Sequence, residues 1–146
     1  MRRIGITGGI GSGKSVVSRL LRIMGYSVYD TDSEAKRLME SSLEVVQKLS
    51  ECFGRDIYHN GRLNRGLLSS RVFGKSDKIV LLNSIVHPVV RFDFYRWSES
   101  LNEEICFVES AILYESRFDE LVDEVWTVTA PEELRTVSYT HLTLPT

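Results

Sequence analysis

A glycine-rich run close to the N-terminus is the first part of the chain whose residues could do chemistry. Residues 8–15 read Gly-Gly-Ile-Gly-Ser-Gly-Lys-Ser and fit the pattern G-x-x-x-x-G-K-[ST]. Glycines allow the backbone to turn several N–H groups toward one point, where they attract an anion. In this pattern Lys14 brings a positive charge to the β- and γ-phosphates of a nucleotide, and Ser15 offers a hydroxyl to Mg²⁺. We therefore predict a nucleotide phosphate site at Gly8, Gly9, Gly11, Ser12, Gly13, Lys14 and Ser15.

The segments on either side of this run support the interpretation. Residues 3–7 form a short apolar run that is typical of a buried strand. Residues 14–24 place apolar side chains at helical spacing, at Val17, Leu20, Leu21 and Met24. The start of that helix would add the positive end of its dipole to the site. The alternative is a glycine-rich turn that binds nothing, and the strand and helix around the run argue against it.

Three acidic residues follow predicted strands and are candidates for the chemical step. Asp30 and Asp32 come after a short strand at 26–29, at the edge where open α/β sheets bind ligands. A carboxylate there could accept the proton of a hydroxyl that attacks the γ-phosphate, or it could cap the next helix. Glu109 ends a third strand at 105–108, and it could bind Mg²⁺ through water or be an ordinary surface acid.

Basic residues in the middle of the chain could contact a phosphorylated substrate. His87 precedes Pro88 on an apolar stretch, where a histidine is more often a packed core residue than a catalyst. Arg65, Arg91 and Arg96 could reach substrate phosphates, although most surface arginines serve no specific role. Arg65, His87 and Arg91 are therefore the candidate substrate-binding residues.

Strands alternate with helices along the chain, which predicts an α/β fold of the P-loop type with a parallel sheet. A fourth strand is expected at 124–129, followed by a helix from Pro131. Nearly all of 33–101 is helical in pattern, with a tight turn at Asn60-Gly61 and a helix or kink boundary at Pro88. We interpret 1–135 as one P-loop domain in which a helical insertion, at about 33–101, covers a substrate site.

The composition excludes several other classes of protein. The chain has 146 residues, enough for one domain, and 42% of them are apolar. Its net charge of −2 provides no basic field, which argues against nucleic acid as a partner. Cys52 and Cys106 lack metal-ligand spacing, so we expect free thiols in a reducing cytoplasm. No apolar stretch predicts a signal peptide or a membrane span, so no membrane partner is expected, and nothing indicates an oligomeric state.

Residues 136–146 differ in character from the rest of the chain. They are rich in β-branched residues and carry no charge apart from His141, although a helix is predicted to begin just before them. We expect a non-native tail, and an ordinary disordered terminus is the alternative.

Several motifs in one order resemble a single family, the dephospho-CoA kinases. Residues 7–15 resemble the start of these enzymes, and Asp30-Thr31-Asp32 resembles their Asp-x-Asp at the end of the second strand. Taken together, the similar segments span residues 1 to about 135 and are more specific than the phosphate loop alone. The further similar segments are Gly61-x-Leu63-x-Arg65-x-x-Leu68 with Val72-Phe73, Leu82-Asn83 with His87-Pro88, and Val108 to Glu115.

The resemblance implies a reaction and assigns roles to residues. Such a kinase transfers the γ-phosphate of ATP to the ribose 3′-hydroxyl of dephospho-CoA, giving CoA and ADP. By this resemblance Gly11 to Val16 hold the ATP phosphates, and Ser15 helps to bind Mg²⁺. Asp32 is the expected base for the 3′-hydroxyl, and the helical insertion is expected to cover the acceptor.

The chain departs from the family's pattern in three places. Val16 stands where serine or threonine is usual, and Glu109-Ser110-Ala111 replaces a segment that often carries aspartate or proline. The family also continues past Arg135 with a basic lid, a last strand and further helices. We expect the lid and the last strand to be missing here, and the 146-residue polypeptide to be inactive or very weak.

Three other functions compete with this one. A kinase for another small molecule or a nucleoside monophosphate would share the loop, the sheet and the metal, although the Asp-Thr-Asp and His-Pro segments argue against it. A regulatory GTPase would need an Asn-Lys-x-Asp guanine motif, which the sequence lacks. A non-catalytic fragment that keeps only the phosphate loop is the third alternative.

Overall fold

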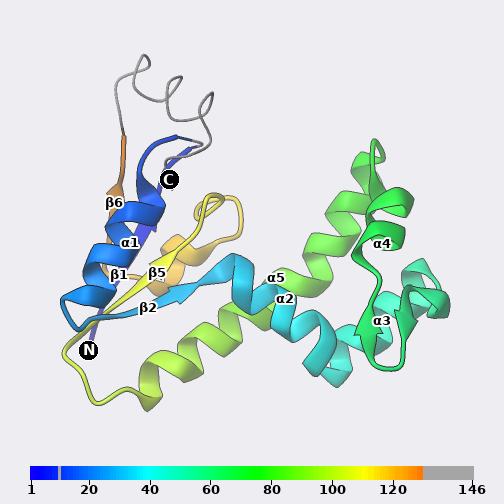
Figure 1. The fold of residues 1–146 in the computed structure, drawn as a ribbon. Coiled ribbons are helices and arrows are strands. Elements are labelled where there is room, and N and C mark those ends of the chain that lie inside the picture. The colour runs from blue at the N-terminus through cyan, green and yellow to red at the C-terminus, as the bar shows by residue number, and fades with distance from the viewer. Residues whose placement is uncertain (10, 130–146) are drawn as a thin grey trace. The chain divides into compact units, whose positions relative to one another are not determined.

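The computed structural model describes residues 1–9 and 11–129, and the chain divides into two compact units. The first unit contains Met1–Thr31 and the chain from Phe94 onward, and the second contains Asp32–Asp93. Figure 1 shows the elements of both units along the chain. Each unit has its own buried residues and is described separately below.

A four-stranded parallel sheet organises the first unit. Its strands are β1 (Arg2–Thr7), β2 (Ser27–Asp30), β5 (Ile105–Glu109) and β6 (Glu124–Thr127), in the order β2-β5-β1-β6. β1 pairs in parallel with β5 and with β6, and β2 pairs in parallel with β5. This sheet, with its helices, confirms the predicted α/β class. Because all four strands run the same way, Thr7, Asp30 and Glu109 end at the same edge.

One face of this sheet is covered by helix α1 (Lys14–Ile23), as Figure 1 shows. Leu21 is buried with Ile4, Ile6 and Phe107, and Val17 packs against the same cluster. The predicted apolar face was too wide, because Leu20 is 54% exposed and Met24, which follows the helix, is 68% exposed.

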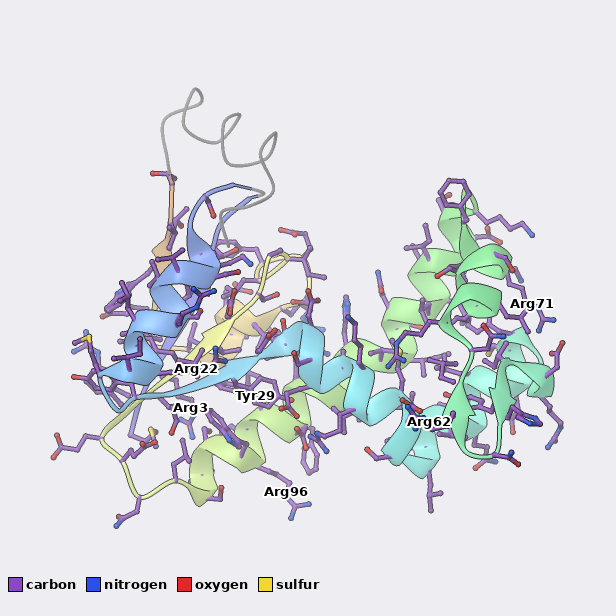
Figure 2. The ribbon with its side chains drawn as sticks, viewed as in Figure 1. Arg3, Arg22, Tyr29, Arg62, Arg71 and Arg96 are labelled. Atoms are coloured by element: carbon purple, nitrogen blue, oxygen red, sulfur yellow. The ribbon has the colours of Figure 1, made fainter. Side chains whose placement is uncertain are left out.

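Aromatic side chains fill a second part of this unit. Tyr29 on β2 (Figure 2) lies edge-on to Phe94, with ring centroids 5.3 Å apart. Phe94 in turn lies 5.7 Å from Phe118, which begins the short 3-10 helix η2 (Phe118–Leu121). Phe94 and Phe118 are both almost fully buried, so these rings hold the end of β2 against the rest of the unit.

The second unit is almost entirely helical. Its elements are α2 (Thr31–Ser41), α3 (Leu43–Phe53), η1 (Arg55–Ile57), β3 (Tyr58–His59), β4 (Arg62–Leu63), α4 (Arg65–Val72) and most of α5 (Ser76–Ser100). α2 opens with Thr31, the last residue of the first unit, and α5 continues into the first unit from Phe94. Buried apolar side chains come from each helix, among them Leu38, Leu49, Leu68 and Val86.

Local signals in the sequence explain several boundaries of this unit. Asn60 and Gly61 both have positive φ, 52° and 78°, as the two-residue turn between β3 and β4 requires. The Asn64 side chain accepts a hydrogen bond from the Leu67 N–H and caps α4. Arg71 (Figure 2) donates to both carboxylate oxygens of Asp56 and ties α4 to η1.

The helix start predicted at Ser33 is wrong, and so is a helix end at Pro88, one of the two possibilities predicted there. α2 begins at Thr31 and not at Ser33, so that Asp32 lies in the first turn of the helix. α5 is one helix of 25 residues that continues through Pro88, because proline's fixed φ fits a helix although its N–H is missing. The buried side chains of Ile85, Val86 and Val90 on either side of Pro88 offset that lost hydrogen bond.

β6 ends at Thr127, two residues earlier than predicted, and the helix predicted from Pro131 and the tail at 136–146 lie outside the described residues. The assignment of 1–135 to one domain with a substrate-covering insertion at 33–101 stays a prediction. Within residues 1–9 and 11–129, no helix combines the length and the apolar character needed to cross a membrane.

Candidate functional site

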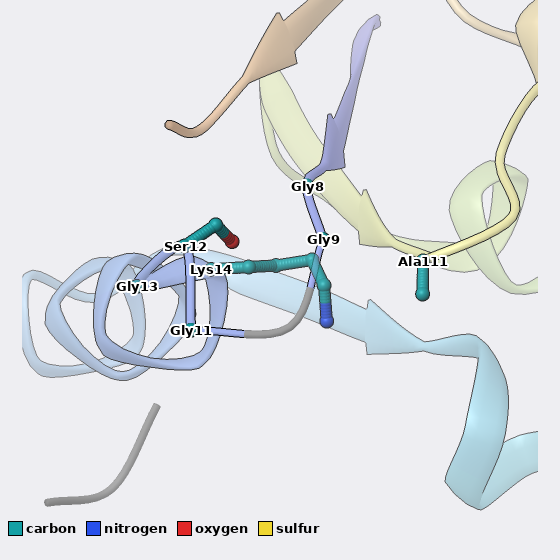
Figure 3. A pocket seen from close by; sticks show the side chains of 7 residues that line it. All are labelled: Gly8, Gly9, Gly11, Ser12, Gly13, Lys14 and Ala111. Carbon is teal, nitrogen blue, oxygen red and sulfur yellow. The ribbon is translucent and has the colours of Figure 1, made fainter. Parts of the chain in front are cut away.

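A pocket opens between the end of β1 and the start of α1, where the sequence predicts the phosphate site (Figure 3). Its lining combines six residues of the predicted glycine-rich run with one residue from the segment after β5. The lining residues are Gly8, Gly9, Gly11, Ser12, Gly13, Lys14 and Ala111. Six of the seven residues that the glycine-rich run predicted for the phosphate site therefore line one concave surface.

Glycine is required at several positions of this loop for different reasons. Gly11 and Gly13 have φ of 73° and 92°, a region that side chains disfavour. A Cβ atom on Gly8 would lie 2.6 Å from both the Ser12 Oγ and the Val128 carbonyl oxygen. At Gly9, by contrast, a Cβ would meet no atom within 4 Å. At Gly8, Gly11 and Gly13 the loop follows its tight path because these positions carry no side chain.

The start of α1 supplies donors and a favourable dipole to the pocket. Gly13 is the N-cap, and it has no side chain to accept hydrogen bonds from the first-turn N–H groups. No acidic residue lies in the first turn, so nothing on the helix itself neutralises its positive end. The loop and the helix start therefore suit an anion such as a phosphate group.

Lys14 and Glu109 form the charged pair of the site. The Lys14 Nζ donates to the Glu109 Oε1 over 3.2 Å, and the two side chains are 18% and 9% exposed. Figure 3 shows the Lys14 side chain running from the start of α1 across the pocket. Glu109 ends β5 next to β1, and this pairing of strands brings it to a lysine 95 residues away. The carboxylate predicted to bind Mg²⁺ through water thus has Lys14 as its partner, and its metal role stays a prediction.

Ser12, Ser15 and Val16, three residues of the predicted phosphate site, have different surroundings. The Ser12 Oγ is buried, and no hydrogen-bond partner for it lies among the described residues. Ser15 and Val16 lie in the first turn of α1 and are not among the residues that line the pocket. Their predicted contacts with nucleotide and Mg²⁺ therefore stay predictions.

The remaining candidates belong to the second unit. Asp32 is exposed in the first turn of α2. Arg65 pairs with Glu40 over 3.7 Å and donates to the Lys36 carbonyl oxygen over 3.3 Å, so its guanidinium is held by neighbours within its own unit. The roles of Asp32 and Arg65 stay predictions.

His87 and Arg91 lie one helical turn apart on α5. His87 is half-buried, and burial, followed by the positive charge of Arg91, lowers the pKa of its imidazole below the usual value. A neutral imidazole beside a guanidinium can accept a hydrogen bond, which is compatible with either a packing or a binding role. The substrate-binding role predicted for both residues therefore stays a prediction.

Sequence reasoning missed two residues near this site. Ala111 lines the pocket because it follows the end of β5, and its position after a predicted strand was the only available signal. Thr31 donates its hydroxyl to the Glu109 carbonyl oxygen over 2.9 Å, a contact that the sequence could not indicate without the strand order. Among residues 1–9 and 11–129, no group of three or more His, Cys, Asp or Glu side chains is arranged to hold a metal ion.

Comparison with known proteins identifies relatives for almost the whole chain. Residues 2–140 match the family described as dephospho-CoA kinase. A dephospho-CoA kinase of Porphyromonas gingivalis is 48% identical over 135 residues, covering 92% of this chain and 67% of the relative. One from Bacteroides fragilis is 43% identical over 134 residues, covering 91% and 65%. The chain thus spans about two thirds of the length of these curated relatives.

A solved structure has the same fold. The crystal structure of TT1252 from Thermus thermophilus superposes with a TM-score of 0.79 at 34% sequence identity. The match covers 97% of this chain and 72% of that one. The arrangement of the loop, the sheet and the helices therefore occurs in a related protein of known structure.

Proposed function

The chain belongs to the dephospho-CoA kinase family, and from this premise we propose that it transfers the γ-phosphate of ATP to the ribose 3′-hydroxyl of dephospho-CoA. The products are CoA and ADP, which makes the reaction the last step of CoA biosynthesis. The observation that supports the proposal best is the pocket at the start of α1, which the glycine-rich loop and Lys14 line. An ATP triphosphate is the anion that such a loop suits.

In this proposal the loop holds the phosphates, and Lys14 stabilises the charge that develops on the transferred group. The pocket that receives the phosphates is lined by Gly8, Gly9, Gly11, Ser12 and Gly13, and Ser15 and Val16 follow on α1. As the 3′-oxygen bonds to the γ-phosphorus, the bond from that phosphorus to the bridging oxygen of ADP breaks. Lys14 offsets negative charge on the phosphoryl oxygens as this happens.

We propose Asp32 as the base for the acceptor. Its carboxylate would accept the proton of the ribose 3′-hydroxyl while the oxygen attacks. Support comes from the family membership and from the place of Asp32 in the chain, two residues after the end of β2. Arg65, His87 and Arg91 would contact the acceptor from the helical insertion.

We further propose that Ser15 and Glu109 are the protein's contacts to Mg²⁺. Their hydroxyl and carboxylate oxygens are the hard donors that this ion prefers. A nucleotide-bound Mg²⁺ keeps most of its ligands as phosphate oxygens and water, so few protein donors are needed. When bound, the ion would neutralise negative charge on the nucleotide phosphates.

We propose a cytoplasmic location and no nucleic acid or membrane as a partner. Two free cysteines, Cys52 and Cys106, fit a reducing compartment, and the net charge of −2 does not favour a polyanion.

The test uses a version of the protein extended to the full length of its relatives, because the 146-residue polypeptide is expected to be inactive or very weak. It offers this version ATP and Mg²⁺ with dephospho-CoA, a nucleoside monophosphate and a simple sugar as separate acceptors. We expect a product phosphorylated on the ribose 3′-position from dephospho-CoA alone, located by phosphorus NMR. Transfer to a nucleoside monophosphate instead would favour the competing kinase. ATP binding without transfer to any acceptor would favour the non-catalytic alternative.

A pair of acid variants tests the assignment of the base. Asp32→Asn should lower kcat by about 10²-fold or more and leave ATP affinity within about threefold. Asp30→Asn is the matched control, because it changes the neighbouring acid at the end of β2. If Asp30→Asn abolishes turnover and Asp32→Asn does not, the base is Asp30.

A further inference from the structure

Glu109 forms hydrogen bonds with two segments of the chain that are distant from it in the sequence. Its carboxylate accepts from the Lys14 ammonium over 3.2 Å. Its backbone carbonyl oxygen accepts from the Thr31 hydroxyl over 2.9 Å. The residue thus contacts the phosphate loop with its side chain and the start of α2 with its main chain.

The Thr31 contact lies where the β2–β5 ladder ends. Asp30 and Glu109 are the last paired residues of that ladder, and Thr31 is the first residue of α2. A side-chain hydrogen bond immediately beyond the last pair prolongs the attachment of the chain to β5 by one residue. Thr31 is also half-buried, so solvent competes little for its hydroxyl.

Thr31 separates the two acids that are candidates for the catalytic base. Asp30 precedes it on β2, and Asp32 follows it in the first turn of α2. Anchoring the hydroxyl of Thr31 restricts the backbone from which both carboxylates project. A base that is misplaced by about 1 Å can cost on the order of 10²-fold in rate, so such a restraint bears on catalysis.

We propose that Thr31 is a positioning residue for phosphoryl transfer, which acts by fixing the start of α2 to the Glu109 carbonyl oxygen. The inference rests on the proposed function, since it presumes that Asp32 accepts the proton of the acceptor. Thr31 itself touches neither nucleotide nor acceptor in this scheme. Its effect therefore falls on kcat and not on the affinity for ATP.

The chain offers a matched pair of variants at this position. Thr31→Val keeps the branched shape and removes the hydroxyl, whereas Thr31→Ser keeps the hydroxyl and removes a methyl group. We expect Thr31→Val to lower kcat by about tenfold or more, with the Kd for ATP and the thermal midpoint little changed. Thr31→Ser should stay within about twofold of the parent in kcat.

Three results would overturn the inference. They are an unchanged kcat in Thr31→Val, an equal loss in Thr31→Ser, or a loss of ATP binding in Thr31→Val that matches its loss of turnover. A second measurement tests the route through Asp32: in an Asp32→Asn background, Thr31→Val should change the residual single-turnover rate by less than about twofold. The variants are made in the full-length version of the protein. If that unsubstituted version phosphorylates no acceptor, the proposed function itself fails, a result distinct from an active parent with an equally active Thr31→Val.

Discussion

The Lys14 ammonium and the Glu109 carboxylate lie 3.2 Å apart at the carboxyl edge of the parallel sheet. Both side chains are largely shielded from water, so each charge depends on the other for compensation. A bound triphosphate would offer Lys14 a second anionic partner. Lys14 therefore contributes both to the stability of the protein without nucleotide, through Glu109, and to its affinity for the nucleotide.

Removal of the lysine charge should have two separable effects. Lys14→Met should weaken ATP binding about 10- to 100-fold, the loss of one charge-assisted contact. It should also lower the free energy of unfolding by about 1–3 kcal/mol, because the Glu109 carboxylate is left without its partner. Calorimetric titration measures the first effect, and urea unfolding measures the second.

The double variant Lys14→Met/Glu109→Gln separates these effects. It removes both charges, so most of the lost stability should return while ATP binding stays weak. A double variant that binds ATP as tightly as the parent would show that Lys14 makes no contact with the nucleotide.

The two neighbouring glycines at the start of the loop should respond differently to alanine. Gly8→Ala should destabilise the protein by about 1–3 kcal/mol, since its Cβ would crowd the Ser12 Oγ and the Val128 carbonyl oxygen. Gly9→Ala should change the unfolding free energy by less than about 0.5 kcal/mol, because its Cβ points into open space. Thermal or urea unfolding compares the two. Equal stabilities would contradict the close approach at Gly8.

The two cysteines should differ in reactivity. Burial raises the pKa of the Cys106 thiol to about 11, and the side chain is buried in β5. Cys52 on α3 is exposed. A thiol reagent at neutral pH should therefore modify Cys52 quickly in the native protein and Cys106 only after unfolding. Mass spectrometry after a timed reaction counts the modified thiols, and rapid native labelling of Cys106 would be the opposite of this expectation.

The pKa of His87 predicts a loss of stability in mild acid. Burial and the charge of Arg91 lower the pKa of His87 in the folded chain, so the unfolded chain binds its proton more readily. The free energy of unfolding should thus fall as the pH drops below about 6.5, the ordinary value, toward the lower folded pKa. His87→Gln should reduce the difference in stability between about pH 7.5 and about pH 5.5. An unchanged difference would assign the acid sensitivity to other groups.

Local patterns predicted the parts of the molecule that depend on local chemistry. The glycine run produced a phosphate-type pocket because positive φ and missing side chains are properties of the glycines themselves. The Asn60-Gly61 turn was predicted for the same reason. A helix end at Pro88 was wrong because the lost hydrogen bond is a local effect, whereas the packing of Ile85, Val86 and Val90 that sustains α5 is not.

The contacts across the sheet could not be predicted from the sequence. Glu109 was predicted either to bind Mg²⁺ through water or to be a surface acid, and its pairing with Lys14 follows only once β5 is known to lie beside β1. The Thr31 contact depends in the same way on β2 lying on the other side of β5. A single sequence indicates where strands lie along the chain but not their order in the sheet. That order is set by the helical segments that connect the strands.

The order of the strands also dictates when the site can exist during synthesis. β1 pairs only with strands from the far end of the described chain, Arg2 with Ile105 and Ile4 with Glu124. At about 5–20 residues per second, a ribosome needs at least several seconds to deliver those partners. During that interval β1, the apolar strand before the phosphate loop, lacks its partner strands and can pair with the wrong segment. Nucleotide binding cannot yet stabilise the fold. The nascent chain should therefore bind ATP only late in its synthesis, after Ile105–Glu109 has left the exit tunnel.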